Sequence, residues 1–115
     1  RSTLFPYTTL FRSRTGTHYE QVSKKMGYRV LPPEPLVNGI AWLYAINNVN
    51  NKAIHFYKLN LEYYPNSIGV YYNLARFYES IGDIGNAILY FDKSLRIVED
   101  PEIKQKIAEL KAEKK

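Results

Sequence analysis

Small and large apolar residues recur through the middle of the chain at a fixed distance of 34 residues. Within each copy they follow the spacing i, i+3, i+4, i+7, which places them on one face of an α-helix. The recurring positions are Ile40-Ala41 and Leu74-Ala75, Tyr44 and Tyr78, Ala53-Ile54 and Ala87-Ile88, Tyr57 and Phe91, and Leu61 and Leu95. Because a constant period of this kind marks stacked repeats, the pattern predicts an all-α fold.

Both copies resemble the tetratricopeptide repeat, in which two antiparallel helices form the unit. The second copy reads Tyr71-x2-Leu74-Ala75-x2-Tyr78 and then Ala87-x3-Phe91, and the first reads Val37-x2-Ile40-Ala41-x2-Tyr44 and then Ala53-x3-Tyr57 and Pro65. The small residues let two helix backbones approach, and the large residues fill the space beside them. The resemblance implies two tetratricopeptide-like helix-turn-helix repeats, one at residues 34–67 and one at residues 68–100.

Turn and capping residues indicate where the four helices of these repeats begin and end. The expected helices run from about Leu36 to Asn48, from the N-cap Asn50 to Tyr63, from the N-cap Ser67 or Asn66 to Ser80, and from the N-cap Asp83 to Val98. A capping helix is expected at residues 101–115, where Asp100 precedes Pro101. Its apolar residues form one stripe and its other faces carry lysine and glutamate, as a terminal helix requires. The stripe consists of Ile103, Ile107 and Leu110.

Residues 14–33 are expected to form a short helix and a proline-rich junction. Thr17 is a suitable N-cap for a helix to about Met26, and Gly27 ends it in the left-handed conformation. Pro32-Pro33 then stiffens the approach to the first repeat. His18 has no serine, carboxylate or second histidine arranged around it in the sequence, so we expect a surface residue without a catalytic role.

Residues 1–13, RSTLFPYTTLFRS, resemble the in-frame translation of a common sequencing adapter. We therefore treat this segment as an artefact, expect it to be disordered and exclude it from the fold. The same resemblance implies that the natural sequence is interrupted at about Arg14. The sequence accordingly leaves the compartment open, and both cytoplasm and periplasm fit.

Composition excludes several classes of function. The formal net charge is +5, and it falls to +3 without Arg1 and Arg12 of the first segment. Most of the remaining excess lies among the lysines of the last helix, which alternate with glutamates as on a solvated face, so we predict no nucleic-acid binding. The absence of cysteine excludes disulfides, thiol nucleophiles and thiolate metal sites, and no apolar run approaches the ~20 residues of a membrane span. No cofactor is predicted.

Tetratricopeptide domains bind partners in the groove lined by the first helix of each repeat. By the repeat register, the lining residues here would be Asn38, Trp42, Ile46, Tyr72, Arg76 and Glu79. Domains of this family that bind chaperone tails use a clamp of lysine, arginine and asparagine. Asn73 fits one clamp position, but Trp42 stands where an asparagine is needed, so we do not predict that activity. The cluster of Trp42, Tyr72 and Arg76 is either a docking surface for a partner or a face that touches a neighbouring domain.

A second resemblance covers most of the chain after the first segment. The string HYEQVSKKMGYRVLPPEPLVN and the repeats that follow are similar to the C-terminal extension of bacterial esterases of the α/β-hydrolase fold, relatives of the siderophore esterases. The matching residues are Ser23, Gly27-Tyr28, Pro32-Pro33-Glu34, Asn38, Leu59-Asn60 and Tyr64-Pro65-Asn66-Ser67. The chain departs from that pattern at Ala41-Trp42, where Gly-Tyr is usual, and at Tyr72-Asn73, where Asp-Ser is usual.

The chemistry of those esterases does not carry over to this chain. They need a G-x-S-x-G nucleophile elbow and an acid and a histidine placed by a sheet, and this sequence has no such elbow. His55, inside the second helix of repeat 1, has no partners spaced for a metal site. The resemblance therefore implies a non-catalytic tail of a larger esterase, which packs on the catalytic domain or presents a binding groove. The alternative is a stand-alone adaptor that recruits another protein.

Overall fold

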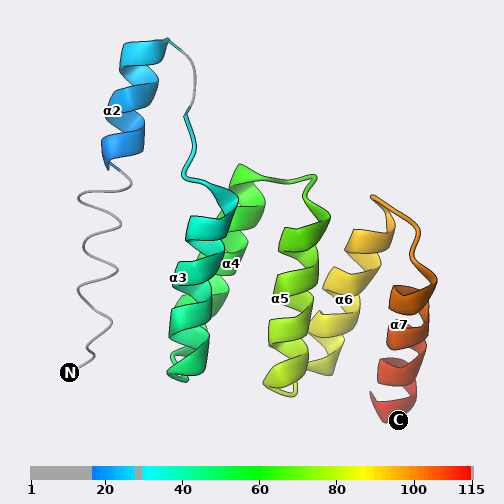
Figure 1. Cartoon of the computed structure of the whole chain (residues 1–115). Helices are drawn as coiled ribbons and strands as arrows, with labels where there is room; N and C mark the ends of the chain where they lie inside the picture. The colour runs from blue at the N-terminus through cyan, green and yellow to red at the C-terminus, as the bar shows by residue number, and fades with distance from the viewer. Residues whose placement is uncertain (1–16, 28–29, 115) are drawn as a thin grey trace.

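The computed structural model describes residues 17–27 and 30–114, and the regular elements in these residues are all α-helices (Figure 1). They are α2 (Thr17–Met26), α3 (Glu34–Ile46), α4 (Asn50–Tyr63), α5 (Ile68–Ser80), α6 (Ile84–Leu95) and α7 (Pro101–Lys114). The all-α repeat fold predicted from the sequence is confirmed. The predictions for residues 1–13 and for the side chain of His18 fall outside the described residues.

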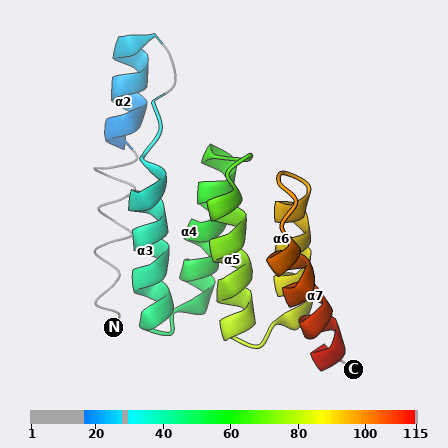
Figure 2. The same cartoon turned by 45° about the vertical axis from the view of Figure 1, so that its right-hand side comes forward.

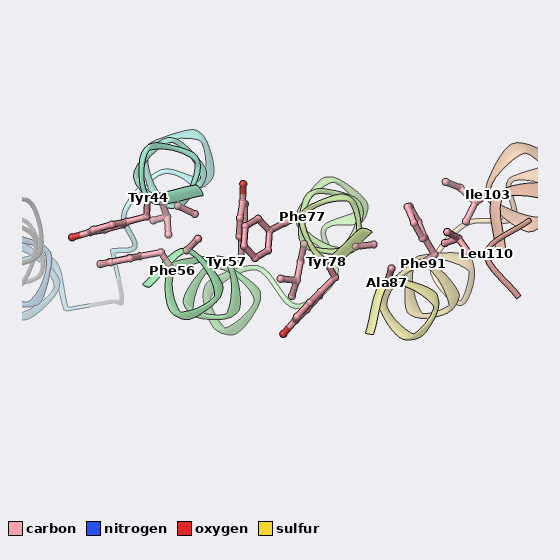
Figure 3. Packing of buried hydrophobic residues seen from close by; sticks show 14 of the residues in the cluster. Tyr44, Phe56, Tyr57, Phe77, Tyr78, Ala87, Phe91, Ile103 and Leu110 are labelled. Atoms are coloured by element: carbon pink, nitrogen blue, oxygen red, sulfur yellow. The ribbon is translucent and has the colours of Figure 1, made fainter. Parts of the chain in front are cut away.

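Helices α3 to α7 stand side by side in chain order, and each runs opposite to the one before it (Figures 1 and 2). They form two layers, with α3, α5 and α7 in one and α4 and α6 in the other (Figure 3). Each helix packs mainly on its neighbours in the chain, as expected for a stacked-repeat fold. Helix α2 stands beyond α3 and packs little on the other described helices.

A continuous apolar core runs between the two layers (Figure 3). The four small residues singled out by the repeat pattern are fully buried, namely Ala41, Ala53, Ala75 and Ala87. The 34-residue period also appears in ring geometry: Tyr44 stacks on Phe56 with centroids 5.5 Å apart, and Tyr78 stacks on Tyr90 at 5.6 Å. The two repeats meet where Tyr57 of α4 contacts Phe77 of α5, at a centroid distance of 5.5 Å.

The ends of α3 differ from the prediction by two residues. The helix begins at Glu34 and not at Leu36. Pro35 fits the first turn because it lacks a backbone N–H where the helix does not need one, and its ring holds φ at a helical value. It ends at Ile46 and not at Asn48, because Asn48 has a φ of 60°, which no helix interior allows. Gly82 occupies the corresponding turn 34 residues later, with a φ of 81°.

Helix α6 ends at Leu95, three residues before the predicted end. Beyond it, the N–H groups of Arg96 and Ile97 bond to carbonyls only three residues back, at 3.2 and 3.1 Å. This tighter turn is the usual way for a helix to finish. The hydroxyl of Ser94 donates to the carbonyl of Phe91 at 2.6 Å and competes with the regular helical bonds there.

The predicted N-cap positions are confirmed at α5, α6 and α7, and they are wrong at α4 and at α2, which begins at Thr17 itself. Asp83 Oδ1 accepts a hydrogen bond from the N–H of Asn86 at 3.2 Å, and Asp100 Oδ1 accepts one from the N–H of Glu102 at 2.9 Å. Asn50 is the first residue of α4 and not its cap; Val49 precedes it and gives no side-chain bond. Ser67 does occupy the N-cap of α5, but its hydroxyl bonds to another residue.

The last helix covers the end of the stack as its pattern predicts. Ile103, Ile107 and Leu110 are buried on one face, and α7 packs on α6 (Figure 3). On the side of α7 near α5, Lys106 Nζ lies 2.6 Å from a carboxylate oxygen of Glu79. This ion pair ties α7 to the layer that contains α3 and α5.

Candidate binding groove

The layer of α3, α5 and α7 carries two adjoining hollows. The first has a volume of about 440 Å³ and lies between α3 and α5, with Tyr57 of α4 also on its wall. The second has a volume of about 500 Å³ and lies between α5 and α7. Arg76 lines both of them, so the two hollows adjoin at this side chain of α5. We call this surface the inner groove.

All six residues expected from the repeat register lie along the inner groove, but in two groups. Asn38, Trp42 and Ile46 line the first hollow, Tyr72 and Glu79 line the second, and Arg76 belongs to both. The sequence analysis did not place α7 in the groove, although Glu102 and Lys106 line its second hollow. A signal was present, since Lys106 follows Tyr72 by one further 34-residue period.

Two asparagine amides meet in the first hollow. Asn73 Nδ2 donates a hydrogen bond to Asn38 Oδ1 at 2.9 Å, which joins α5 to α3. Within the described part of the chain, this bond leaves the Asn38 amide with its N–H donors and the Asn73 amide with its carbonyl acceptor. The pair therefore offers free N–H donors and a free carbonyl acceptor in adjacent amides, which can bond to the C=O and the N–H of a peptide group.

Large apolar side chains surround this amide pair. Trp42 is 54% exposed and Ile46 is 53% exposed, one helical turn apart on α3, and Ile81 adds to the same hollow from the end of α5. An exposed tryptophan in a hollow is typical of a surface that another molecule covers. The first hollow therefore combines exposed apolar side chains with the polar amide pair.

Residues 68–100 match the family model of the tetratricopeptide repeat. This part of the chain is similar to a tetratricopeptide repeat. The match spans α5, α6 and the connection that leads to α7. The comparison with curated proteins found no significantly similar sequence.

Aromatic and charged side chains of residues 68–100 line the second hollow together with residues of α7. The guanidinium of Arg76 lies over the ring of Tyr72, 5.6 Å from its centroid, and Tyr72 meets the buried ring of Phe91 edge-on at 5.7 Å. Glu79 is held by Lys106, and the hydrogen bond from Lys106 to Glu79 raises the pKa of that lysine. Glu79 therefore joins α5 to α7 through this ion pair, and its carboxylate is already engaged within the groove.

The described side chain of His55 lies outside the inner groove. His55 is exposed on α4 and contacts Phe56 edge-on at 5.1 Å, away from the hollows of the inner groove. Among the side chains that the structure describes, no three from histidine or acidic residues lie close enough together to hold a metal ion. None of the helices described is long and apolar enough to cross a membrane.

Proposed function

We propose that the chain is a non-catalytic protein-interaction module whose inner groove binds an extended segment of a partner protein. The observation that carries this proposal is the Asn38–Asn73 amide pair, set between helices of adjacent repeats and beside the exposed Trp42. A donor and an acceptor held side by side can bond to the N–H and C=O of an extended chain. Trp42 and Ile46 then cover its side chains.

The tetratricopeptide repeat in residues 68–100 supports the same proposal, because repeats of this family generally mediate protein–protein interaction. Helical folds of this kind are typically non-catalytic. The composition of the groove agrees, since tryptophan, tyrosine and arginine are the residues enriched where binding energy concentrates.

We further propose that the module belongs to a larger esterase of the α/β-hydrolase fold. One support is the sequence resemblance described above. The other is a pair of hydrogen bonds between the junction segment and the repeat segment that share this resemblance. Tyr64 donates its hydroxyl proton to the carbonyl of Pro32 at 2.7 Å, and Asn60 Nδ2 donates to the carbonyl of Glu34 at 3.2 Å. Pro32 and Glu34 are in the junction part of the resemblance, and Asn60 and Tyr64 are in the repeat part. The proline-rich junction is thereby fixed to α4, as a rigid connection between two domains requires.

The groove proposal can be tested with a displayed library of random eight-residue peptides, selected on the full chain. We expect bound peptides to lose affinity when Trp42→Ala is combined with Asn73→Ala, with an unchanged circular dichroism spectrum. A matched control is Leu89→Ala combined with Asn51→Ala, which alters exposed residues of α6 and α4. The proposal would be contradicted if no peptide were selected, or if both double variants lost the same amount of peptide affinity.

The esterase proposal has a separate test. The chain should not hydrolyse activated esters such as p-nitrophenyl acetate above background, whereas the gene that contains it should encode a G-x-S-x-G motif after a predicted strand upstream. Upstream sequence that contains only further 34-residue repeats would favour the alternative, a stand-alone adaptor. Turnover by the chain itself would contradict both.

A further inference from the structure

The first hollow of the inner groove carries one uncompensated charge. Arg76 is the single charged residue among the described residues that line it. No carboxylate of the described chain lies within ion-pair distance of its guanidinium. The nearest acid along its own helix face, Glu79, is already bonded to Lys106 at 2.6 Å.

The position of the guanidinium leaves its hydrogen-bond donors available. The guanidinium carbon of Arg76 lies over the Tyr72 ring, 5.6 Å from its centroid, and no hydrogen bond or ion pair among the described residues engages the guanidinium. The five N–H donors point outward in the plane of the group, where they match the two oxygens of a carboxylate.

The second hollow indicates on which side an acidic group would lie. Glu102 lines that hollow together with Arg76 and has no ion pair among the described residues. Its carboxylate disfavours a second acid on the α7 side of Arg76. The α3 side has no acid and offers Trp42 and Ile46 instead.

We propose that the inner groove selects protein segments in which an aspartate or glutamate stands next to an aromatic or large aliphatic residue. The carboxylate binds the guanidinium of Arg76, and the apolar neighbour covers Trp42 and Ile46. The Asn38–Asn73 pair bonds to the backbone of the same segment, which is why the partner is a protein and not another anion. This inference rests on the proposed peptide-binding function and adds the chemical class of the partner.

The test uses the peptides selected from the random library described above. Acidic residues adjacent to aromatic or large aliphatic ones should be enriched among them. One selected peptide and its analogue, in which the acid is replaced by the corresponding amide, are then measured by fluorescence anisotropy against three proteins. These are the unaltered chain, Arg76→Gln, and the control Arg96→Gln, which removes the same charge from the exposed end of α6.

For the acidic peptide, Arg76→Gln should weaken binding about tenfold or more, the usual effect of losing a charge-assisted hydrogen bond. For the amide analogue, Arg76→Gln should change binding less than about twofold, because the two changes remove one shared interaction. Arg96→Gln should leave both affinities within about twofold.

The outcomes separate this inference from the function on which it rests. The inference would be overturned if the enriched peptides contained no acidic residues. It would also be overturned if Arg76→Gln reduced the affinity for the acidic peptide and for its amide analogue equally. In either case the groove would remain a peptide-binding site. Acidic peptides that weaken equally with Arg96→Gln would also overturn it, because the attraction would then belong to the overall charge. If no peptide is selected, both proposals fail.

Discussion

The hydroxyl of Ser67 lies 3.0 and 3.1 Å from the two carboxylate oxygens of Glu34. Glu34 begins α3 and Ser67 precedes α5, so this hydrogen bond joins the starts of two helices that are 33 residues apart. It also places a negative charge at the N-terminus of α5, where the helix dipole favours an anion. A Cβ on Gly69 would lie 3.3 Å from Glu34 Oε1, which shows how closely the carboxylate approaches the first turn.

Replacing this carboxylate should therefore weaken the contact between the two repeats. We expect Glu34→Ala to lower the free energy of unfolding by about 1 kcal/mol, measured by urea denaturation, because both the hydrogen bond and the dipole interaction are lost. Glu62→Ala removes an exposed acid from α4 and should change it by less than about 0.5 kcal/mol. Equal effects from the two variants would mean that the Glu34 contact contributes nothing to stability.

Enlarging a fully buried alanine should overpack the core of the second repeat. Ala87 has no exposed surface, and we expect Ala87→Leu to cost about 1–3 kcal/mol in the free energy of unfolding. Ala108→Leu makes the same change at an exposed position of α7 and should have little effect. A loss below about half a kcal/mol for Ala87→Leu would contradict the packing of α6 described here.

The turns at Asn48 and Gly82 are equivalent in the two repeats. Adding a Cβ at Gly82 should lower the free energy of unfolding, whereas removing the side chain at Asn48 should not. Gly82→Ala forces an L side chain to a φ of 81° and should cost about 1–2 kcal/mol. Space is not the reason, since an added Cβ would meet no atom within 4 Å. Asn48→Gly should be neutral or slightly stabilising, because glycine adopts a φ of 60° more readily than asparagine. Urea denaturation of the two variants gives the comparison, and a stabilising Gly82→Ala would show that this turn is not constrained.

Stability should fall in alkaline solution. Burial raises the pKa of Tyr57 and of Tyr78, and the hydrogen bond to Glu79 raises the pKa of Lys106. These contributions are fully present well below about pH 10, where all three groups are protonated in both the folded and the unfolded chain. They are lost as the pH rises further, because the unfolded chain releases protons that the folded chain retains.

Urea denaturation at about pH 8 and about pH 11 measures this loss, and tyrosinate absorbance reports the ionisation. Tyr57→Phe should reduce the difference between the two pH values, because one raised pKa is removed. An unchanged free energy of unfolding up to about pH 11 would contradict the prediction.

The sequence predicts burial in this chain better than it predicts polar contacts. Period and spacing identified the buried alanines and the aromatic residues beside them, because these positions depend on the geometry of the helix. The bond between Ser67 and Glu34 could not be predicted in the same way, since it depends on how one helix start is placed against another. Ser67 occupies the N-cap position of α5 as predicted, but its hydroxyl bonds to Glu34 and not to the backbone of α5.

The inner groove was likewise predicted only in part. The repeat register placed Trp42 and Arg76 on one surface, since both belong to first helices of repeats. It did not reveal that Lys106 engages Glu79, because the last helix had been interpreted only as a cover for the core. A polar face on a terminal helix has no pattern that separates solvated residues from those that reach a neighbour.

The order in which the helices pack also determines where the domain opens first. Helix α7 packs chiefly on α6, and apart from the apolar stripe its further tie is the partly exposed pair of Lys106 and Glu79. Each unit of a stacked fold is stabilised by its immediate neighbours, so separation of the last helix leaves the contact between Tyr57 and Phe77 intact. Backbone amides of α7 should therefore exchange with solvent deuterium well before those of α4 and α5. Such an opening widens the groove on the α7 side of Arg76, while the α3 side keeps its shape.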